Sequence, residues 1–411
     1  MGLTSGSTKT DKKLCTIDDL CAIYHPFQSY LRLNFMDYKR VNGRFAIPSS
    51  KLLQVGLVLA AYDCIGNAIK CVAAIASGNV NLAQEIFAVF GMAVVMTSRG
   101  FSLEFNRNKL SKLYNDLDRI FPRSAFLQER MEVEKCHRYI KRRFFFFHNF
   151  MCAEVAPFCV MPLIKFLLAY DFEEKGPVPD EFHLNASWMP FGVKENLSVY
   201  PFIYAYETIL ALIAVNMIIT WDQVFAVTMS HLCMYYQYLA KLLEEIDVRE
   251  ANDPQQRQAF FKQLHHYIYT NQCLNKIASD LNDIFNLSIL ISDMCIAASI
   301  CFHLFLVSDA SDYLAVATYI WPCLTEMWLL YDVAKWGTLL ETVTSRINEV
   351  LYEQPWYESS LQLQKYTMMW MQGTNEPMRL TAFNIFNVNM KHFQDMMMLA
   401  YQMLTFMKSK S

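Results

Sequence analysis

Charged residues are scarce in this 411-residue chain, where Asp, Glu, Lys and Arg together make up 18% of the sequence. Ordinary soluble domains contain roughly 25%. Glycine and proline are also few, at 12 and 13 residues, although a soluble chain of this length would need many loops. The formal net charge of -3 provides no basic field for binding nucleic acid. These shortages argue against a soluble enzyme and against a nucleic-acid partner.

Catalytic and metal-binding motifs are missing as well. The sequence contains no P-loop, GxGxxG, HExxH or GxSxG motif, and its 12 cysteines include no CxxC pair. Most of these cysteines lie inside apolar stretches, where a free thiol packs as a small hydrophobic group. The neighbouring His265 and His266 are more typical of a solvated helix face than of a metal site. We therefore expect no enzyme, no cofactor and no metal centre.

Long apolar stretches are abundant, and 54% of the residues are hydrophobic. A window of about 19 residues identifies seven candidate membrane spans. They lie near residues 46–76, 82–105, 144–170, 199–220, 283–307, 313–333 and 380–406. Each reaches the roughly 20 residues that a helix needs to cross about 30 Å of hydrocarbon. The polar N-terminus has no signal-peptide pattern, so insertion must use these internal segments. Counts of six or eight are also compatible with the hydropathy.

Lysine and arginine give the orientation, because cytoplasmic loops carry the positive excess. The segments on the side of the N-terminus contain 27 of these residues, and those on the opposite side contain four. This predicts a cytoplasmic N-terminus and an extracellular C-terminus, opposite to a G-protein-coupled receptor. Two glycosylation sequons, at Asn185 and Asn196, fall in the same predicted extracellular loop. A third, at Asn286, lies inside a span and is expected to be unused.

Three cytoplasmic segments have apolar residues at helical spacing. Residues 106–143 are basic and end in Lys141, Arg142 and Arg143, which favours an anchor at the lipid headgroups over a regulatory lipid site. Residues 222–282 and 334–375 carry apolar stripes that need a partner. We expect these helices to extend from the membrane and pack together, or on a neighbouring subunit, as a cytoplasmic assembly platform.

Ionisable residues inside membrane spans are costly and suggest function. Arg99, Lys165 and Glu207 are near span ends, where we expect them to reach the interface. Glu154 is deepest within an apolar stretch, and it either lines a cavity or makes a helix-helix contact. The spans show no charge ladder of a pump or voltage sensor and no inverted repeat, which disfavours a transporter.

Four groups of residues form an ordered pattern along the chain. These are Trp221 to Phe225 with His231 and Leu239; Trp188 to Phe191 with Tyr200 to Phe202; Gly337 with Tyr352, Glu353 and Pro355 to Tyr357; and Pro377, Leu380 to Ala382, Phe393 and Ala400 to Gln402. Their order, their spacing and the inverted topology resemble the insect odorant receptor family, from about residue 30 onward. The chain departs from the family pattern at Ala334, Phe383, Ala400 and Gln402.

The resemblance implies an all-α integral membrane protein with seven transmembrane helices and a cytoplasmic helical anchor region. The expected parts are a cytoplasmic N-terminal segment (1–45), a six-helix ligand-binding region (46–333), a cytoplasmic anchor segment (334–379), and a pore-lining last helix with a short tail (380–411). The modest loop at 241–280 is similar to odour-tuning subunits, since the co-receptor of this family has a longer insertion there.

By the same resemblance, the protein is a tuning subunit that assembles with the co-receptor as a heterotetrameric, non-selective cation channel. A small volatile ligand, apolar or aromatic, opens it directly at the plasma membrane of a sensory neuron dendrite. The implied partners are this ligand, the co-receptor, membrane lipid and permeating cations. The alternatives are an inverted-topology metabotropic chemoreceptor and a small-molecule transporter.

The resemblance also assigns candidate residues. Expected ligand-binding residues are Phe87, Phe90, Glu154, Phe158, Phe202, Tyr206 and Tyr319. Leu404 is the expected gate, with Tyr401 and Lys408 near the pore mouth, and Trp336, Tyr352 and Trp356 are expected to serve assembly. An apolar ring can gate by dewetting. Lys408 either points sideways or tempers conduction by this subunit, because a positive side chain opposes cation flow.

Overall fold

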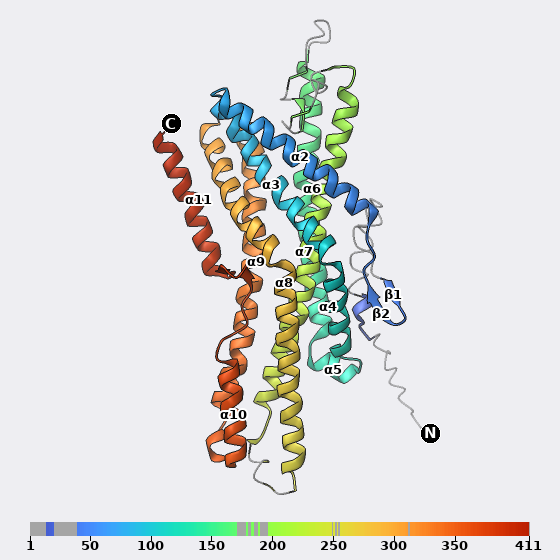
Figure 1. Ribbon diagram of the computed structural model, residues 1–411, viewed down its shortest axis with the longest axis vertical. Coiled ribbons are helices and arrows are strands. Elements are labelled where there is room, and N and C mark those ends of the chain that lie inside the picture. Colours follow the sequence, from blue (N-terminus) through green and yellow to red (C-terminus); the bar gives the residue numbers. More distant parts are fainter. Residues whose placement is uncertain are drawn as a thin grey trace, which may run out of the picture.

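The computed structural model describes residues 14–19, 39–170, 178–179, 182–184, 188–189, 196–248, 250, 253, 255–310 and 313–410. Its helices are α2 (Lys51–Ala76), α3 (Val80–Phe105), α4 (Arg107–Ile120), α5 (Ala125–Arg130), α6 (Val133–Ala169), α7 (Tyr200–Glu244), α8 (Arg257–Asp309), α9 (Tyr313–Glu353), α10 (Leu361–Thr374) and α11 (Met390–Lys410). Two antiparallel hairpins join β1 (Lys39–Val41) to β2 (Arg44–Ala46) and β3 (Thr381–Ala382) to β4 (Phe386–Asn387). Figure 1 shows an elongated helical molecule.

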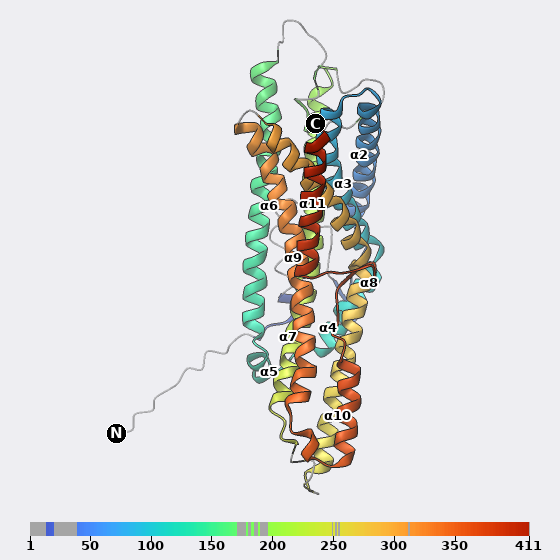
Figure 2. The same ribbon diagram turned by 90° about the vertical axis from the view of Figure 1, so that its left-hand side faces the viewer.

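Seven of these helices, α2, α3, α6, α7, α8, α9 and α11, lie at the seven predicted spans. Within the described part of the chain, five are long and apolar enough to cross a membrane, namely α2, α3, α6, α7 and α8. The sixth and seventh predicted spans form α9 and α11, which fall outside that group. The upper half of the molecule in Figures 1 and 2, which we call the membrane half, contains α2, α3, α11, most of α6 and the upper parts of α7, α8 and α9.

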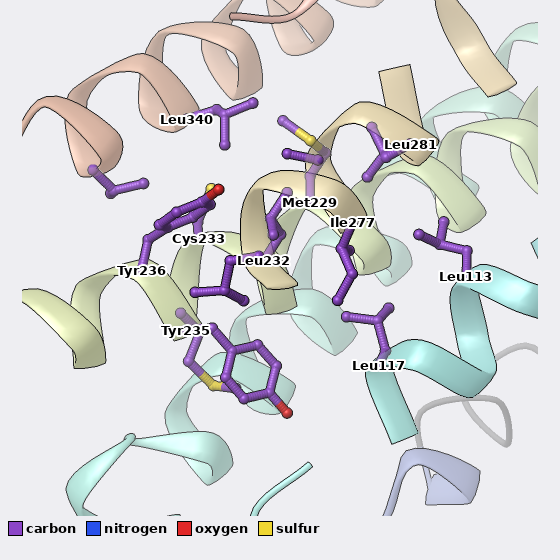
Figure 3. Packing of buried hydrophobic residues seen from close by; sticks show 14 of the residues in the cluster. Leu113, Leu117, Met229, Leu232, Cys233, Tyr235, Tyr236, Ile277, Leu281 and Leu340 are labelled. Atoms are coloured by element: carbon purple, nitrogen blue, oxygen red, sulfur yellow. The ribbon is translucent and has the colours of Figure 1, made fainter. Parts of the chain in front are cut away.

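The lower half, which we call the base, consists of α4, α5, α10 and the lower parts of α7, α8 and α9 (Figure 2). The predicted helical extensions are present, because α7, α8 and α9 run on without a break for 45, 53 and 41 residues. Their apolar stripes meet in one core, shown in Figure 3. Among its labelled members are Met229, Leu232 and Tyr236 of α7, Ile277 and Leu281 of α8, and Leu340 of α9.

Helix α4 accounts for the amphipathic segment that follows the second span. It buries Leu110, Leu113, Tyr114 and Leu117 in the core of the base, where it packs on α8. The apolar face that the sequence predicts therefore lies against protein. Arg143, expected at the lipid headgroups together with Lys141 and Arg142, is buried, whereas the other two are exposed.

The last membrane helix begins later than predicted, because residues 380–389 are not helical. Phe383 and Asn384 occupy the turn between β3 and β4 with φ values of 50° and 57°, and the Ile385 N–H closes this turn by donating to the carbonyl oxygen of Ala382 at 3.0 Å. The backbone N–H of Val388 donates to the carbonyl oxygen of Leu380 at 2.8 Å. The hairpin buries Leu380 and Ala382 in the core of the base, so their hydropathy reflects protein packing.

Candidate ligand site and pore helix

Two predicted ligand-binding aromatics, Phe87 and Phe90, are neighbours on α3, with ring centroids 6.4 Å apart. Phe87 also stacks on Phe302 of α8 at 5.2 Å. It lines a largely apolar cleft of about 640 Å³, whose other walls come from α2, α8 and α11. Small-molecule sites typically measure about 300–1,000 Å³. The cleft is thus large enough for a small ligand, and it places a predicted ligand residue opposite the predicted pore helix.

Two other predicted residues link α9 to its neighbours. Glu154 of α6 accepts a hydrogen bond from the Thr325 hydroxyl of α9 at 2.8 Å. The Tyr319 hydroxyl of α9 donates to Glu85 Oε1 of α3 at 3.3 Å. Of the two possibilities for Glu154, the structure shows the helix-helix contact. Helix α9 is therefore tied to both α6 and α3 in the membrane half.

A buried polar cluster joins α8, α9 and α3 close to the Glu154 contact. Glu326 Oε1 lies 2.5 Å from Ser299 Oγ, and Glu326 Oε2 lies 3.2 Å from His303 Nδ1. Ser299 Oγ is also 2.7 Å from the carbonyl oxygen of Ala88. The sequence places Glu326, an ionisable residue, inside the predicted span at 313–333. It gives no indication of Ser299 or His303, because their partners lie on other helices.

The predicted aromatics of α6 and α7 lie in different surroundings. Phe202 is 75% exposed and Phe158 is 39% exposed, and neither lines the cleft that contains Phe87. Tyr206 points inward, and its buried hydroxyl has no hydrogen-bond partner among the residues that the structure describes. The next residue, Glu207, is buried and accepts a hydrogen bond from the Leu184 N–H at 3.0 Å. The expectation that Glu207 reaches the interface was wrong, because its carboxylate is held by protein.

Arg99 is also buried instead of interfacial, and only 1% of its surface is exposed. Its guanidinium lies over the Trp221 ring at 4.3 Å, and Nε donates to Ser292 Oγ at 3.3 Å. An aromatic face attracts a cation electrostatically, most strongly when the pair is shielded from water. The interior of the protein thus provides partners that replace the water or headgroups that a snorkelling arginine would reach.

Arg143 forms a buried ion triad with Asp222 of α7 and Asp332 of α9. Its two terminal nitrogens each lie 2.9 Å from an oxygen of Asp222, and one of them also contacts Asp332. Each of the three side chains is at most 6% exposed. Bidentate pairing of this kind fixes geometry as well as charge. The triad therefore joins α6, α7 and α9 where the membrane half meets the base.

The predicted pore residues follow one flank of α11. Tyr401, Leu404 and Lys408 are separated by three and four residues, a spacing that places them on one side of a helix. Tyr401 is 59% exposed, Lys408 is exposed and Leu404 is partly buried. Met403 and Met407 lie on another side of the helix and line the cleft with Phe87. The helix thus presents one flank to the cleft and another away from it.

The predicted assembly residues differ in exposure. Trp336 is 3% exposed and packs against the Tyr139 ring of α6 at 6.3 Å, inside the chain. Tyr352 is 73% exposed, and Trp356 is partly buried in a short 3-10 turn. Nearby, a polar groove of about 600 Å³ runs between α7 and α9 and includes Arg346. Of the three predicted assembly residues, Tyr352 and Trp356 therefore have surface that a partner could contact.

Of the two sequons in the predicted extracellular loop, Asn185 lies outside the described residues. Asn196 is exposed and lies four residues before Tyr200, the first residue of α7. Its side-chain oxygen accepts a hydrogen bond from the Ser198 N–H at 3.0 Å. The exposed position leaves this side chain accessible, and its glycosylation stays a prediction.

The fold and these sites define a seven-transmembrane, all-α receptor of the membrane. A family model described as "7tm Odorant receptor" matches residues 79–401. Odorant receptor 88a of Drosophila melanogaster is 32% identical over 321 residues, covering 78% of this chain and 79% of that protein. Odorant receptor 67c of the same species is 23% identical over 288 residues and covers 68% of each. The chain belongs to the insect odorant receptor family, whose members are ligand-gated cation channels and not enzymes.

Solved structures show the same fold. The insect olfactory receptor OR5 from Machilis hrabei aligns with a TM-score of 0.71 at 14% identity, covering 95% of this chain and 96% of that one. Its complex with eugenol aligns with a TM-score of 0.70 at 12% identity, covering 87% and 88%. The predicted seven-helix fold class and family membership are thus confirmed, and a tuning subunit fits them better than the co-receptor.

Proposed function

We propose that this chain is the odorant-binding tuning subunit of a heterotetrameric, non-selective cation channel that it forms with the family's co-receptor. It would act in the plasma membrane of a sensory neuron dendrite. The observation that carries the proposal is the apolar cleft, because it has Phe87 of α3 on one wall and α11 on the other. A ligand held near α3 can therefore influence the helix that we assign to the pore.

The proposed ligand is a small volatile molecule, apolar or aromatic. Apolar sites with a few polar groups suit such ligands. The residues that support this are the paired Phe87 and Phe90, the inward hydroxyl of Tyr206, and the contacts of Glu154 and Tyr319 with neighbouring helices. Phe158 and Phe202 would contribute from the outer surfaces of α6 and α7. The Machilis receptor in complex with eugenol is a small-molecule example on this fold.

We assign the pore to the flank of α11 that carries Tyr401, Leu404 and Lys408. Leu404 would form the apolar constriction when four subunits face one another, and an apolar ring can close a pore by dewetting. Subunit contacts would come from the base, where Tyr352 is exposed and Trp356 borders the surface. Trp336 supports this indirectly, since it packs α9 against α6.

The direct test is whole-cell current in cells that express this chain alone and then with the co-receptor, during application of a panel of small volatiles. A fast current that needs co-expression and survives removal of guanine nucleotide is expected. Loss of the current with guanine nucleotide would favour the metabotropic alternative. Saturable uptake without unitary openings would favour a transporter.

Replacing Tyr206 tests the ligand site. Tyr206→Ala should shift the half-maximal concentration of some agonists by roughly tenfold, because a pocket contact contributes differently to each ligand. Tyr206→Phe separates the hydroxyl from the ring, and Tyr269→Ala on the exposed surface of the base is the control. Concentration-response curves at matched surface expression provide the measurement. An equal loss for every agonist together with poor trafficking would instead identify Tyr206 as a packing residue.

A further inference from the structure

The start of α11 is fixed to the rest of the chain through the preceding hairpin. At Gly337 of α9, a Cβ atom would overlap the carbonyl oxygen of Val388, so the absence of a side chain allows this close contact. The Met390 N–H donates to Thr338 Oγ1 at 2.8 Å. On the other side, the Thr381 N–H donates to Asn282 Oδ1 of α8 at 2.8 Å. The hairpin therefore delivers α11 to a defined place between α8 and α9.

After the hairpin, few side chains of α11 pack against the rest of the bundle. Of its side chains that the structure describes, three are buried: His392, Met396 and Ala400. They are four residues apart and thus lie on one face of the helix. His392 is the polar member, and its Nε2 lies 2.9 Å from Asp293 Oδ2 of α8. The side chains of this pair are 8% and 6% exposed.

The acidic partner is held in place by other helices. Asp293 lies near Arg99 of α3, whose cationic charge attracts it. Arg99 is in turn fixed over Trp221 of α7 and bonded to Ser292, the neighbour of Asp293 on α8. The His392 ring also stacks on Phe386 of the hairpin at 5.5 Å. Asp293 thus belongs to the rigid bundle, and His392 belongs to the first turn of the helix that moves in the proposed channel.

The two kinds of contact on this face respond differently to motion. Apolar contacts such as those of Met396 and Ala400 are non-directional and tolerate sliding. A hydrogen bond between groups that can carry charge is short and directional, and breaking it leaves a buried carboxylate without that partner. When α11 moves, it would therefore rotate about His392, while Met396 and Ala400 slide along the bundle.

We propose that the Asp293–His392 pair is the pivot of the pore helix, which positions the inner end of α11 on α8 and so sets the balance between closed and open channel. Both are positioning residues. The proposal rests on the assignment of α11 to a cation pore.

The test uses the full chain expressed with the co-receptor. Asp293→Ala, His392→Ala and the double variant are compared for surface expression, current without odorant, half-maximal odorant concentration and unitary conductance. Each single variant should shift the half-maximal concentration at least fivefold and change the current without odorant. The double variant should shift it no further than the larger single effect, because both remove one interaction. Unitary conductance should stay unchanged, since the pair is away from Leu404.

The control is Asp280→Asn, an acid on the same helix whose exposed partner is Lys112 at 2.9 Å. It should leave the odorant response unchanged. If an alanine variant does not reach the cell surface, the test uses Asp293→Asn and His392→Gln, which keep the side chain close to its original size. Each should shift the half-maximal odorant concentration at least threefold. If the wild-type channel conducts and the variants have the same half-maximal odorant concentration and the same current without odorant, the pivot proposal is overturned. Wild-type channels that give no odorant current would overturn the proposed function itself.

Discussion

The base and the membrane half are packed in different ways. The largest apolar core lies mainly in the base, where α4, α7, α8, α9, α10 and both hairpins contribute, and it extends to α2 and α3 of the membrane half. The membrane half has a much smaller core, and α6 stands at its side in Figure 2. Only 17% of the most apolar stretch of α6 is buried in the chain, against 61% for α8. The base thus stabilises itself, whereas the membrane half leaves apolar surface for lipid and neighbouring subunits.

The two halves also place their ion pairs differently. In the base, Arg346 bonds to Glu244 at 2.9 Å on the surface, and the hydrogen bonds that its guanidinium donates to Glu244 and two further carboxylates raise the pKa of Arg346. Exposed pairs of this kind contribute little stability, typically about 0–1 kcal/mol. At the junction with the membrane half, Arg143 and its two aspartates are buried. The junction therefore depends on specific partners, while the base depends on its core.

The largest effect should follow from filling the space at Gly337, where the base meets the pore helix. Gly337→Ala forces the Val388 backbone away from α9, which displaces the hairpin and α11. Odorant-evoked current should fall at least tenfold. Gly373→Ala on α10 is the matched control, because a Cβ atom there meets nothing within 4 Å. Equal currents from the two variants would show that the close contact is unimportant.

Next in size is the loss of the buried triad. Arg143→Ala leaves Asp222 and Asp332 facing each other without their cation, a change that typically costs about 3–5 kcal/mol. Surface expression, measured by labelling intact cells, should fall severalfold. Arg142→Ala removes the exposed arginine next to it and should have little effect. If both variants were expressed equally, the junction would be no more sensitive than the surface.

A smaller effect is expected from the proposed gate. Leu404→Ala should widen the apolar constriction and raise the resting leak by roughly twofold to fivefold, as measured by current in the absence of odorant. Met369→Ala is the control, since Met369 is 69% exposed and lies on α10 in the base, away from α11. Unchanged current properties in the assembled channel would remove Leu404 from the gate.

The smallest effect concerns the hairpin turn. Phe383→Gly should stabilise the protein by about 1 kcal/mol, because glycine adopts a positive φ without the strain that a side chain adds. Thermal unfolding of the purified complex would report this as a rise in Tm. Ile385→Gly, in the same hairpin but without positive φ, should instead lower it. A lower Tm for Phe383→Gly would mean that its exposed ring makes a contact that outweighs the strain.

Hydropathy and charge were enough to predict the seven helices, since lipid imposes one simple requirement on each. Helical spacing was enough to predict the extensions of α7, α8 and α9. The hairpin at 380–389 escaped prediction because Leu380, Ala382 and Ile385 are as apolar as membrane residues. It is distinguished by a turn at Phe383, which has a positive φ and is one of the positions where the chain departs from the family pattern.

The polar contacts of the site were largely beyond prediction. Arg143 lies 79 and 189 residues from its two aspartates, and His392 lies 99 residues from Asp293. No local pattern connects positions so far apart, and only the fold brings them together. The aromatics at Phe87 and Phe90 were predicted as a ligand wall, and the structure places them beside each other. Their role in binding stays a prediction.

The unbroken course of α7, α8 and α9 has a consequence for how such a receptor can change over generations. Because most of the largest core lies in the base, a substitution toward the far end of the membrane half removes only a small share of the packing that keeps the chain folded. Proteins with stability in reserve tolerate more substitutions before they fail. The surface that meets odorants can therefore vary widely while the chain keeps its fold, and new chemical preferences can arise by single changes.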